Sequence, residues 1–170
     1  MMGSEYFVQD LRHISFQQWA DVESYTDIDK LAPIAILIIE KGVTYDYFNN
    51  DLNAKVKALY RLKAKEYMAT IINIFSTIRQ LRDSYYFVYN ADYGQVSGYT
   101  SNGMKEHYKH FKWQDIVVTV AESGMFNGPT GPLHATRNAN VLEVLYYLNI
   151  KRSREAAESR DQIANMNKHK

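Results

Sequence analysis

Apolar residues recur at spacings of three and four along most of this chain, which is the pattern of amphipathic helices. The pattern is clearest after Leu52, where the apolar series continues through Tyr67, Ile71, Ile74, Phe75, Ile78 and Leu81. No proline interrupts the chain between Pro33 and Pro129, so long helices are permitted there. We therefore predict helices over residues 15–25, 28–41, 50–63, 65–89, 110–123, and from 134 to 150 or beyond.

Local signals mark several of the predicted helix boundaries. Ser15 can cap a helix together with Gln18, and Ile14 can pack on Trp19 as a hydrophobic staple. Gly124 follows the apolar series of residues 110–123 and is suited to a left-handed helix end. The segment YYFVY at 85–89 has strand propensity, but its position favours the last turns of a helix.

These elements predict an all-α fold, formed by a single compact helical domain of about five to six helices. We place this domain at residues 1–150, because Leu148 and Ile150 are the last clear core positions. Residues 151–170 carry six basic and three acidic side chains and are predicted to be an exposed charged extension, either helical or disordered. Deleting this extension is expected to leave the domain folded and to weaken binding to a partner.

Turn-forming residues gather in two segments that we interpret as connections. Residues 90–103 are rich in turn-forming residues and predict a long surface loop. Residues 124–134 carry the sequence GMFNGPTGPLH, which lacks the strand, the lysine and the glycine spacing of a phosphate-binding loop. We interpret this second segment as a helix-to-helix connection that binds no phosphate.

Composition favours no particular class of partner. The chain has 20 basic and 19 acidic side chains and no cysteine, which excludes disulfides and a strong overall field. The longest apolar run, LAPIAILII at 31–39, is about half of the roughly 20 residues that a membrane-spanning helix needs. No signal peptide is recognisable at the N-terminus, and we expect a cytosolic protein with no membrane partner.

No sequence motif indicates a catalytic site, a metal site or a cofactor site. The histidines lack the H-E-x-x-H and E-x-x-H spacings that build metal sites in helices; they are His13, His107, His110, His134 and His169. A G-x-S-x-G nucleophile motif is also missing. We therefore expect a protein that is not an enzyme, with no catalytic, cofactor-binding or metal-binding residues.

Residues 105–113, KEHYKHFKW, interleave lysines with aromatic rings. Single-stranded nucleic acids are bound by surfaces of this composition, so a helical nucleic-acid-associated or regulatory protein using this segment and the basic C-terminus is our alternative hypothesis. We favour an amphipathic helix start instead, with the rings packed and the lysines solvated, because the net charge is close to zero.

Fourteen tyrosines distinguish the composition. Tyrosine combines a large apolar surface with a polar tip and is common at protein interfaces. We predict protein-interaction residues in the aromatic segment and in the C-terminal extension: Tyr85, Tyr86, Tyr89, Tyr93, Lys151, Arg152, Arg154 and Arg160.

The order of these segments resembles that of small proteins encoded among the tail genes of tailed bacteriophages. The resemblance is carried by FQQWADVE, DKLAPIAILIIEKG, AKVKALYRLKAKEYMATIINIFSTI, KWQDIVVTVAESGMFN and NVLEVLYYLNIKRSREAAE. It implies a protein of tail or baseplate assembly that contacts other tail or baseplate proteins and is present in the host cytoplasm during assembly. Whether it is an assembly chaperone or a virion component, and whether it forms a homo-oligomer, are left open, and no catalytic residue comes with the resemblance.

Overall fold

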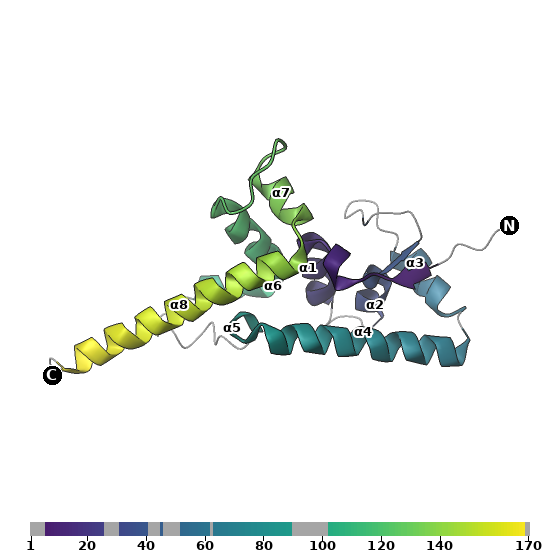
Figure 1. The fold of residues 1–170 in the computed structure, drawn as a ribbon, viewed down its shortest axis with the longest axis horizontal. Helices are drawn as coiled ribbons and strands as arrows, with labels where there is room; N and C mark the ends of the chain where they lie inside the picture. Colours follow the sequence, from purple (N-terminus) through teal and green to yellow (C-terminus); the bar gives the residue numbers. More distant parts are fainter. Residues whose placement is uncertain are drawn as a thin grey trace.

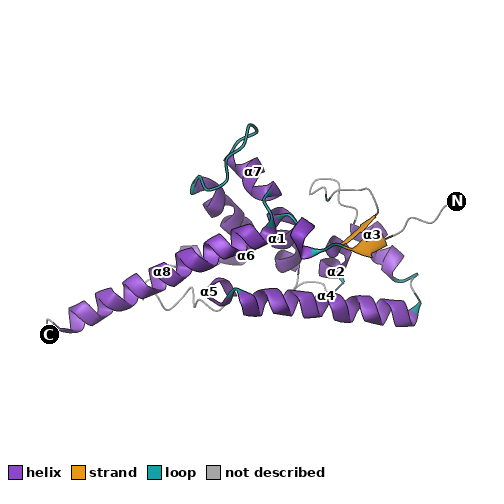
Figure 2. Cartoon of the chain, viewed as in Figure 1, coloured by secondary structure: helices purple, strands orange, loops and turns teal. Residues whose placement is uncertain are grey.

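Helices dominate the molecule, which confirms the predicted all-α class (Figures 1 and 2). The structure is a computed structural model that describes residues 6–25, 31–40, 45, 52–61, 63–89 and 102–168. Its α-helices are α1 (Phe16–Tyr25), α2 (Ala32–Leu37), α3 (Leu52–Leu59), α4 (Ala64–Ser84), α5 (Tyr86–Tyr89), α6 (Asn102–Glu122), α7 (Pro132–Asn138) and α8 (Val141–Lys168). The described residues thus hold eight α-helices where we predicted five to six, because two predicted helices are each divided.

A short antiparallel pair of strands corrects the helix predicted over residues 28–41. Helix α2 ends at Leu37, and β2 (Ile38–Glu40) then pairs with β1 (Tyr6–Val8). An apolar run of this length does not distinguish a buried helix from a strand, so the partner strand decides the conformation. A 3₁₀ turn, η1 (Leu11–His13), leads from β1 toward α1.

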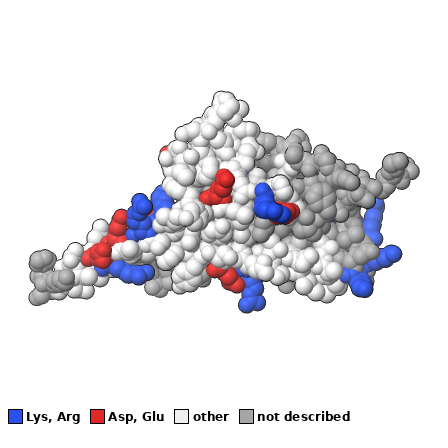
Figure 3. Space-filling model, viewed as in Figure 1, with Lys and Arg blue, Asp and Glu red and all other residues white. Residues whose placement is uncertain are grey.

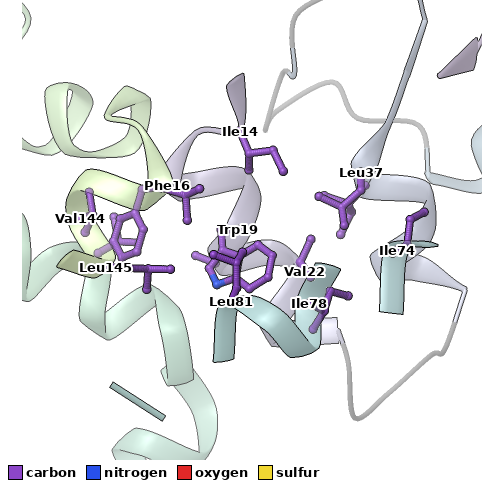
Figure 4. Packing of buried hydrophobic residues seen from close by; sticks show 14 of the residues in the cluster. Ile14, Phe16, Trp19, Val22, Leu37, Ile74, Ile78, Leu81, Val144 and Leu145 are labelled. Carbon is purple, nitrogen blue, oxygen red and sulfur yellow. The ribbon is translucent and has the colours of Figure 1, made fainter. Parts of the chain in front are cut away.

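Helix α1 lies at the centre of the core, and every residue from Phe16 to Glu23 is buried. Its apolar side chains pack with residues from α2, α4, α6 and α8 (Figure 4). The fully buried side chains of largest volume include Trp19, Phe16, Ile14, Ile34, Ile36, Leu37, Ile74 and Leu145. One helix therefore organises most of the hydrophobic core.

The start of α1 agrees with the predicted cap. The backbone N–H of Gln18 donates to Ser15 Oγ at 3.2 Å, which satisfies one of the free donors of the first turn. Ile14 and Trp19, the two residues of the expected staple, are both buried in the core.

The predicted helix over residues 134–150 starts at Pro132 and is interrupted between α7 and α8. At the break, the Phe16 N–H donates to Ala139 O at 2.8 Å, and the Val141 N–H donates to Ile14 O at 3.0 Å. An isolated bridge between Ser15 and Asn140 accompanies these bonds. The chain entering α1 thus replaces hydrogen bonds that an unbroken helix would have made internally.

Two further boundaries differ from the prediction. The helix predicted over 65–89 is interrupted at Tyr85, which separates α4 from α5. Helix α6 begins at Asn102, eight residues before the predicted start at 110. Most of the loop predicted at 90–103 lies outside the described residues.

The connection between α6 and α7 has the helix-to-helix character predicted for residues 124–134. Gly124 and Gly131 adopt φ angles of 69° and 94°, which residues other than glycine rarely adopt. Pro132 occupies the first turn of α7, where its missing N–H has no cost.

Helix α8 continues without interruption past residue 150 to Lys168. Its C-terminal part projects away from the other helices (Figure 1). Independent folding of residues 1–150 stays a prediction.

Candidate functional site

The aromatic segment at 85–89 mostly faces the interior. Tyr85 is half-buried, and its hydroxyl donates to Leu142 O at 3.4 Å. Tyr89 accepts a hydrogen bond from Trp19 Nε1 at 2.8 Å, and burial, together with the nearby Glu23 carboxylate, raises the pKa of Tyr89 above its usual value. Tyr93 lies outside the described residues. Of the predicted tyrosines that the structure describes, Tyr86 is exposed and the other two are half-buried.

Side chains of α8 hold α5 in place. Arg152 Nη1 donates to Val88 O at 2.5 Å, and Asn149 Oδ1 accepts the Phe87 N–H at 2.9 Å. Burial lowers the pKa of Arg152 to about 10, so its guanidinium is still charged at neutral pH. Arg152, predicted as an interaction residue, therefore makes an internal contact that the deletion of residues 151–170 would remove.

The remaining predicted residues lie along the projecting part of α8. Lys151 is half-buried, whereas Arg154 and Arg160 are exposed. We call residues 154–168 the outer segment; its ionisable side chains are three basic and three acidic, namely Arg154, Glu155, Glu158, Arg160, Asp161 and Lys168. Blue and red side chains alternate along it in Figure 3. Its two charge types balance, although the whole extension from 151 is basic.

The buried polar residues of α1 were missed by sequence reasoning. Glu23 is almost fully buried and accepts from Arg82 of α4 at two points, 2.6 Å to Nη2 and 3.2 Å to Nε. Gln18 Nε2 donates to Ile36 O of α2 at 2.9 Å. The sequence held a signal for these buried polar residues. FQQWADVE places polar residues on several sides of the helix, so a helix at the centre of the core has to bury some of them.

Asp21 forms the largest of these buried polar clusters. Its carboxylate accepts from Gln17 Nε2 and from Gln114 Nε2 of α6, each at 3.0 Å, and from the hydroxyl of Tyr45. Burial raises the pKa of Asp21, and the three donors and the charge of Arg137 oppose this shift. The cluster joins α1 to α6 inside the protein, so we assign it a structural role.

Replacing Asp21 by asparagine is expected to alter the dependence of stability on pH. The folded-state pKa of Asp21 lies above its ordinary 3.8, so the folded protein binds this proton more tightly than the unfolded chain. The resulting stabilisation is complete below the ordinary pKa and is lost as the pH rises through the folded-state pKa. The free energy of unfolding of D21N should therefore increase relative to that of the wild type as the pH rises above 3.8.

Urea denaturation of both proteins at successive pH values measures this difference. A difference that stays constant from about pH 4 to about pH 7 would contradict the raised pKa.

The described histidines do not gather into a metal site. His107 Nε2 lies 2.8 Å from Asp115 Oδ1, and its ring stacks near Phe111 with centroids 4.8 Å apart. Three others are exposed: His13, His110 and His134. Within the described ranges, no three histidine, aspartate or glutamate side chains are grouped as a metal ion would require. His169 lies outside those ranges.

Part of the Lys/aromatic segment can be placed. Trp113 is half-buried, with its ring 6.3 Å from that of Phe16 and 5.5 Å from that of Tyr89, whereas Phe111 is exposed. The side chains of Lys105, Lys109 and Lys112 lie outside what the structure describes. Packing of Trp113 agrees with the amphipathic interpretation at that position, whereas the exposed ring of Phe111 contradicts the expectation that it is packed.

Among the described helices, none is both long enough and apolar enough to cross a membrane. No family model matches the chain, and neither curated proteins nor solved structures match it significantly. The resemblance to phage tail proteins therefore rests on the sequence segments quoted above.

Proposed function

We propose that this protein works without catalysis, by docking the outer segment of α8 onto another protein subunit. The observation that carries the proposal is the continuity of one helix face. Val141, Leu145 and Leu148 bury this face in the core. The same spacing of three or four residues continues it through Arg152, which bonds to α5, and then along the outer segment through Ala156, Ser159, Ile163 and Met166.

Beyond the body of the molecule this face is left open. Met166 is 62% exposed and Ile163 is 53% exposed, although each follows the spacing of the buried core residues. Exposed apolar side chains along one side of a helix are suited to a groove on a partner, where they act as anchors at successive turns. The charged residues on the other sides keep the free helix soluble.

The balance of charge favours a protein partner over a nucleic acid. Phosphate binding requires an excess of cations along the contact surface, and the outer segment has three charges of each sign. The alternative, a helical nucleic-acid-associated protein, would have to rely on residues 105–113.

The class of partner comes from the resemblance to phage tail proteins. On that basis we propose that the docked subunit is a tail or baseplate protein and that docking occurs in the host cytoplasm during assembly. The proposal covers both an assembly chaperone and a virion component.

Removing the outer segment is expected to abolish partner recovery and to preserve the fold. A chain ending at Ser153 retains Arg152 and its bond to Val88 O, whereas a chain ending at Ile150 loses this bond. We expect thermal melts of the 1–153 chain to match those of the full chain, and its co-purification with co-expressed tail or baseplate proteins to fail. Equal recovery would remove the outer segment from the interface.

Point variants separate the apolar face from the bulk charge of the helix. The double variant I163D/M166D should weaken partner binding by at least about tenfold, because buried apolar anchors dominate such interfaces. A matched control, A157D/A164D, adds the same charge on the opposite, exposed side and should change binding less than about twofold. Loss of binding in the control alone would contradict the proposed face, and turnover of a small substrate by the full chain would refute the absence of catalysis.

A further inference from the structure

Helix α4 presents a second apolar surface in addition to the one it buries. Ile74, Ile78 and Leu81 face the core and are nearly inaccessible. Three other apolar side chains, spaced by four and three residues, are exposed on an adjacent side; we call them the apolar strip, and they are Met68, Ile72 and Phe75. Ile72 is 63% exposed, although it lies in the middle of a helix of 21 residues.

The remaining exposed side of α4 lacks the large apolar residues of the apolar strip. The exposed residues there are small or polar and include Ala69, Asn73, Ser76 and Gln80. An ordinary surface helix has one apolar face, which it buries, and a polar remainder. The apolar surface of α4 is wider than its own core uses, and contiguous exposed apolar surface of this kind marks interaction sites.

Basic side chains gather at the end of α4 where the apolar strip begins. They come from the end of α3 and from the turn into α4, and we call them the basic cluster: Lys57, Arg61, Lys63 and Lys65, all of them exposed. In Figure 3 blue side chains lie at this end of the molecule. Within the described part of the chain, no salt bridge is formed by the basic cluster.

The two features together specify the chemistry of a partner. Anchors at positions i, i+4 and i+7 are those with which one helix packs on another. Methionine adapts readily to the shape of a partner surface, and the exposed cations of the basic cluster attract carboxylates. We propose that the apolar strip and the basic cluster bind an acidic amphipathic helix of another protein.

An acidic helix fits this surface better than other anionic partners. A single-stranded nucleic acid needs cations that follow its backbone along the whole contact. Between Lys65 and Arg79 helix α4 carries no lysine or arginine, so cations flank the apolar strip at its two ends. Arg79, at the far end, lies 3.8 Å from the carboxylate of Asp83. An anionic lipid surface would require lysine or arginine along the whole length of the apolar face, whereas the exposed residues beside the strip between Lys65 and Arg79 are neutral.

This surface is separate from the one proposed above. The basic cluster lies at the end of the molecule opposite the C-terminal end of α8 (Figure 1). The inference does not depend on docking through the outer segment, and the two surfaces can be tested independently in one full-length protein.

Fluorescence anisotropy with designed peptides tests the inference. The probe is a labelled helical peptide of about four turns, with leucines at successive i, i+3 and i+4 positions and glutamates elsewhere. A matched peptide carries lysine at every glutamate position. The full-length chain is expected to bind the acidic peptide and to bind the basic peptide at least about tenfold more weakly.

Three variants locate the binding on the surface. I72D should weaken the acidic peptide by at least about tenfold, because it places a charge in the middle of the apolar strip. K63E/K65E should do the same by reversing the charge of the basic cluster, with a reduced dependence on salt. The control N73D adds the same charge on the polar side of α4 and should change affinity less than about twofold. Circular dichroism checks that each variant is folded.

Several results would overturn the inference. Absence of binding up to about 1 mM acidic peptide would do so, as would equal binding of the two peptides or equal effects of I72D and N73D. Tighter binding of oligothymidine, or of vesicles of phosphatidylglycerol and phosphatidylcholine, with loss in I72D and K63E/K65E, would show a nucleic-acid or lipid surface instead. Loss of tail-protein recovery in I163D/M166D, with acidic-peptide binding intact, would leave the inference standing.

Discussion

Replacing Trp19 by alanine is expected to lower the free energy of unfolding by about 3–5 kcal/mol. The Trp19 side chain is fully buried in the central helix, so its removal leaves a large cavity in the middle of the core. Because whole domains are stable by only about 5–15 kcal/mol, this loss is a large fraction of the total stability. Urea denaturation of wild type and W19A measures the difference.

A double-mutant cycle separates the hydrogen bond of Trp19 from its packing. In Y89F the buried indole N–H loses its acceptor, which should cost about 1–3 kcal/mol. In W19F the ring volume is largely kept and the donor is removed. The double variant W19F/Y89F should cost less than the sum of the single variants, because neither partner is left unpaired. Additive effects would mean that the bond between α1 and α5 contributes nothing to stability.

Replacing Arg82 by methionine should have the second-largest effect on stability. The side chain of Glu23 is 5% exposed and would remain buried without its cation. Removing one partner of a fully buried ion pair costs about 3–5 kcal/mol; we expect about 2–3 kcal/mol, because the Arg82 side chain is 38% exposed and its charge is partly screened. Urea denaturation again provides the measurement.

Two further variants make this prediction specific. R79M removes an exposed arginine of the same helix, whose nearest carboxylate, on Asp83, lies at 3.8 Å, and should cost less than about 0.5 kcal/mol. E23Q/R82M removes the buried charge as well and should recover part of the loss. Equal costs for R79M and R82M would contradict the role of the ion pair.

The two proposed docking surfaces were only partly visible in the sequence. Periodicity assigned Phe75 to the buried series of α4, but its side chain is exposed as part of the apolar strip. Two adjacent apolar stripes on one helix merge into a single periodic pattern, so spacing alone does not separate the stripe that is buried from the one that is not. The aromatic segment shows the reverse, since Tyr85 and Tyr89 were predicted as interaction residues and are held against the core.

Signals that act over a few residues were sufficient for the fold class and for several boundaries. The Ser15 cap, the helical spacing in α4 and the left-handed end at Gly124 each depend on neighbours within one or two turns, so the sequence determined them. Only the tertiary structure decided the conformation and the hydrogen-bond partners at positions where groups distant in the sequence compete with local ones. Residues 38–40 are a strand because β1 pairs with them, and α7 ends where Ala139 O accepts from Phe16.

The buried carboxylates of Glu23 and Asp21 accept from donors 59 and 93 residues away, on Arg82 and Gln114. Burial makes those distant bonds necessary, because a polar group that loses water must find another partner, and the spacing of residues along the chain does not identify that partner.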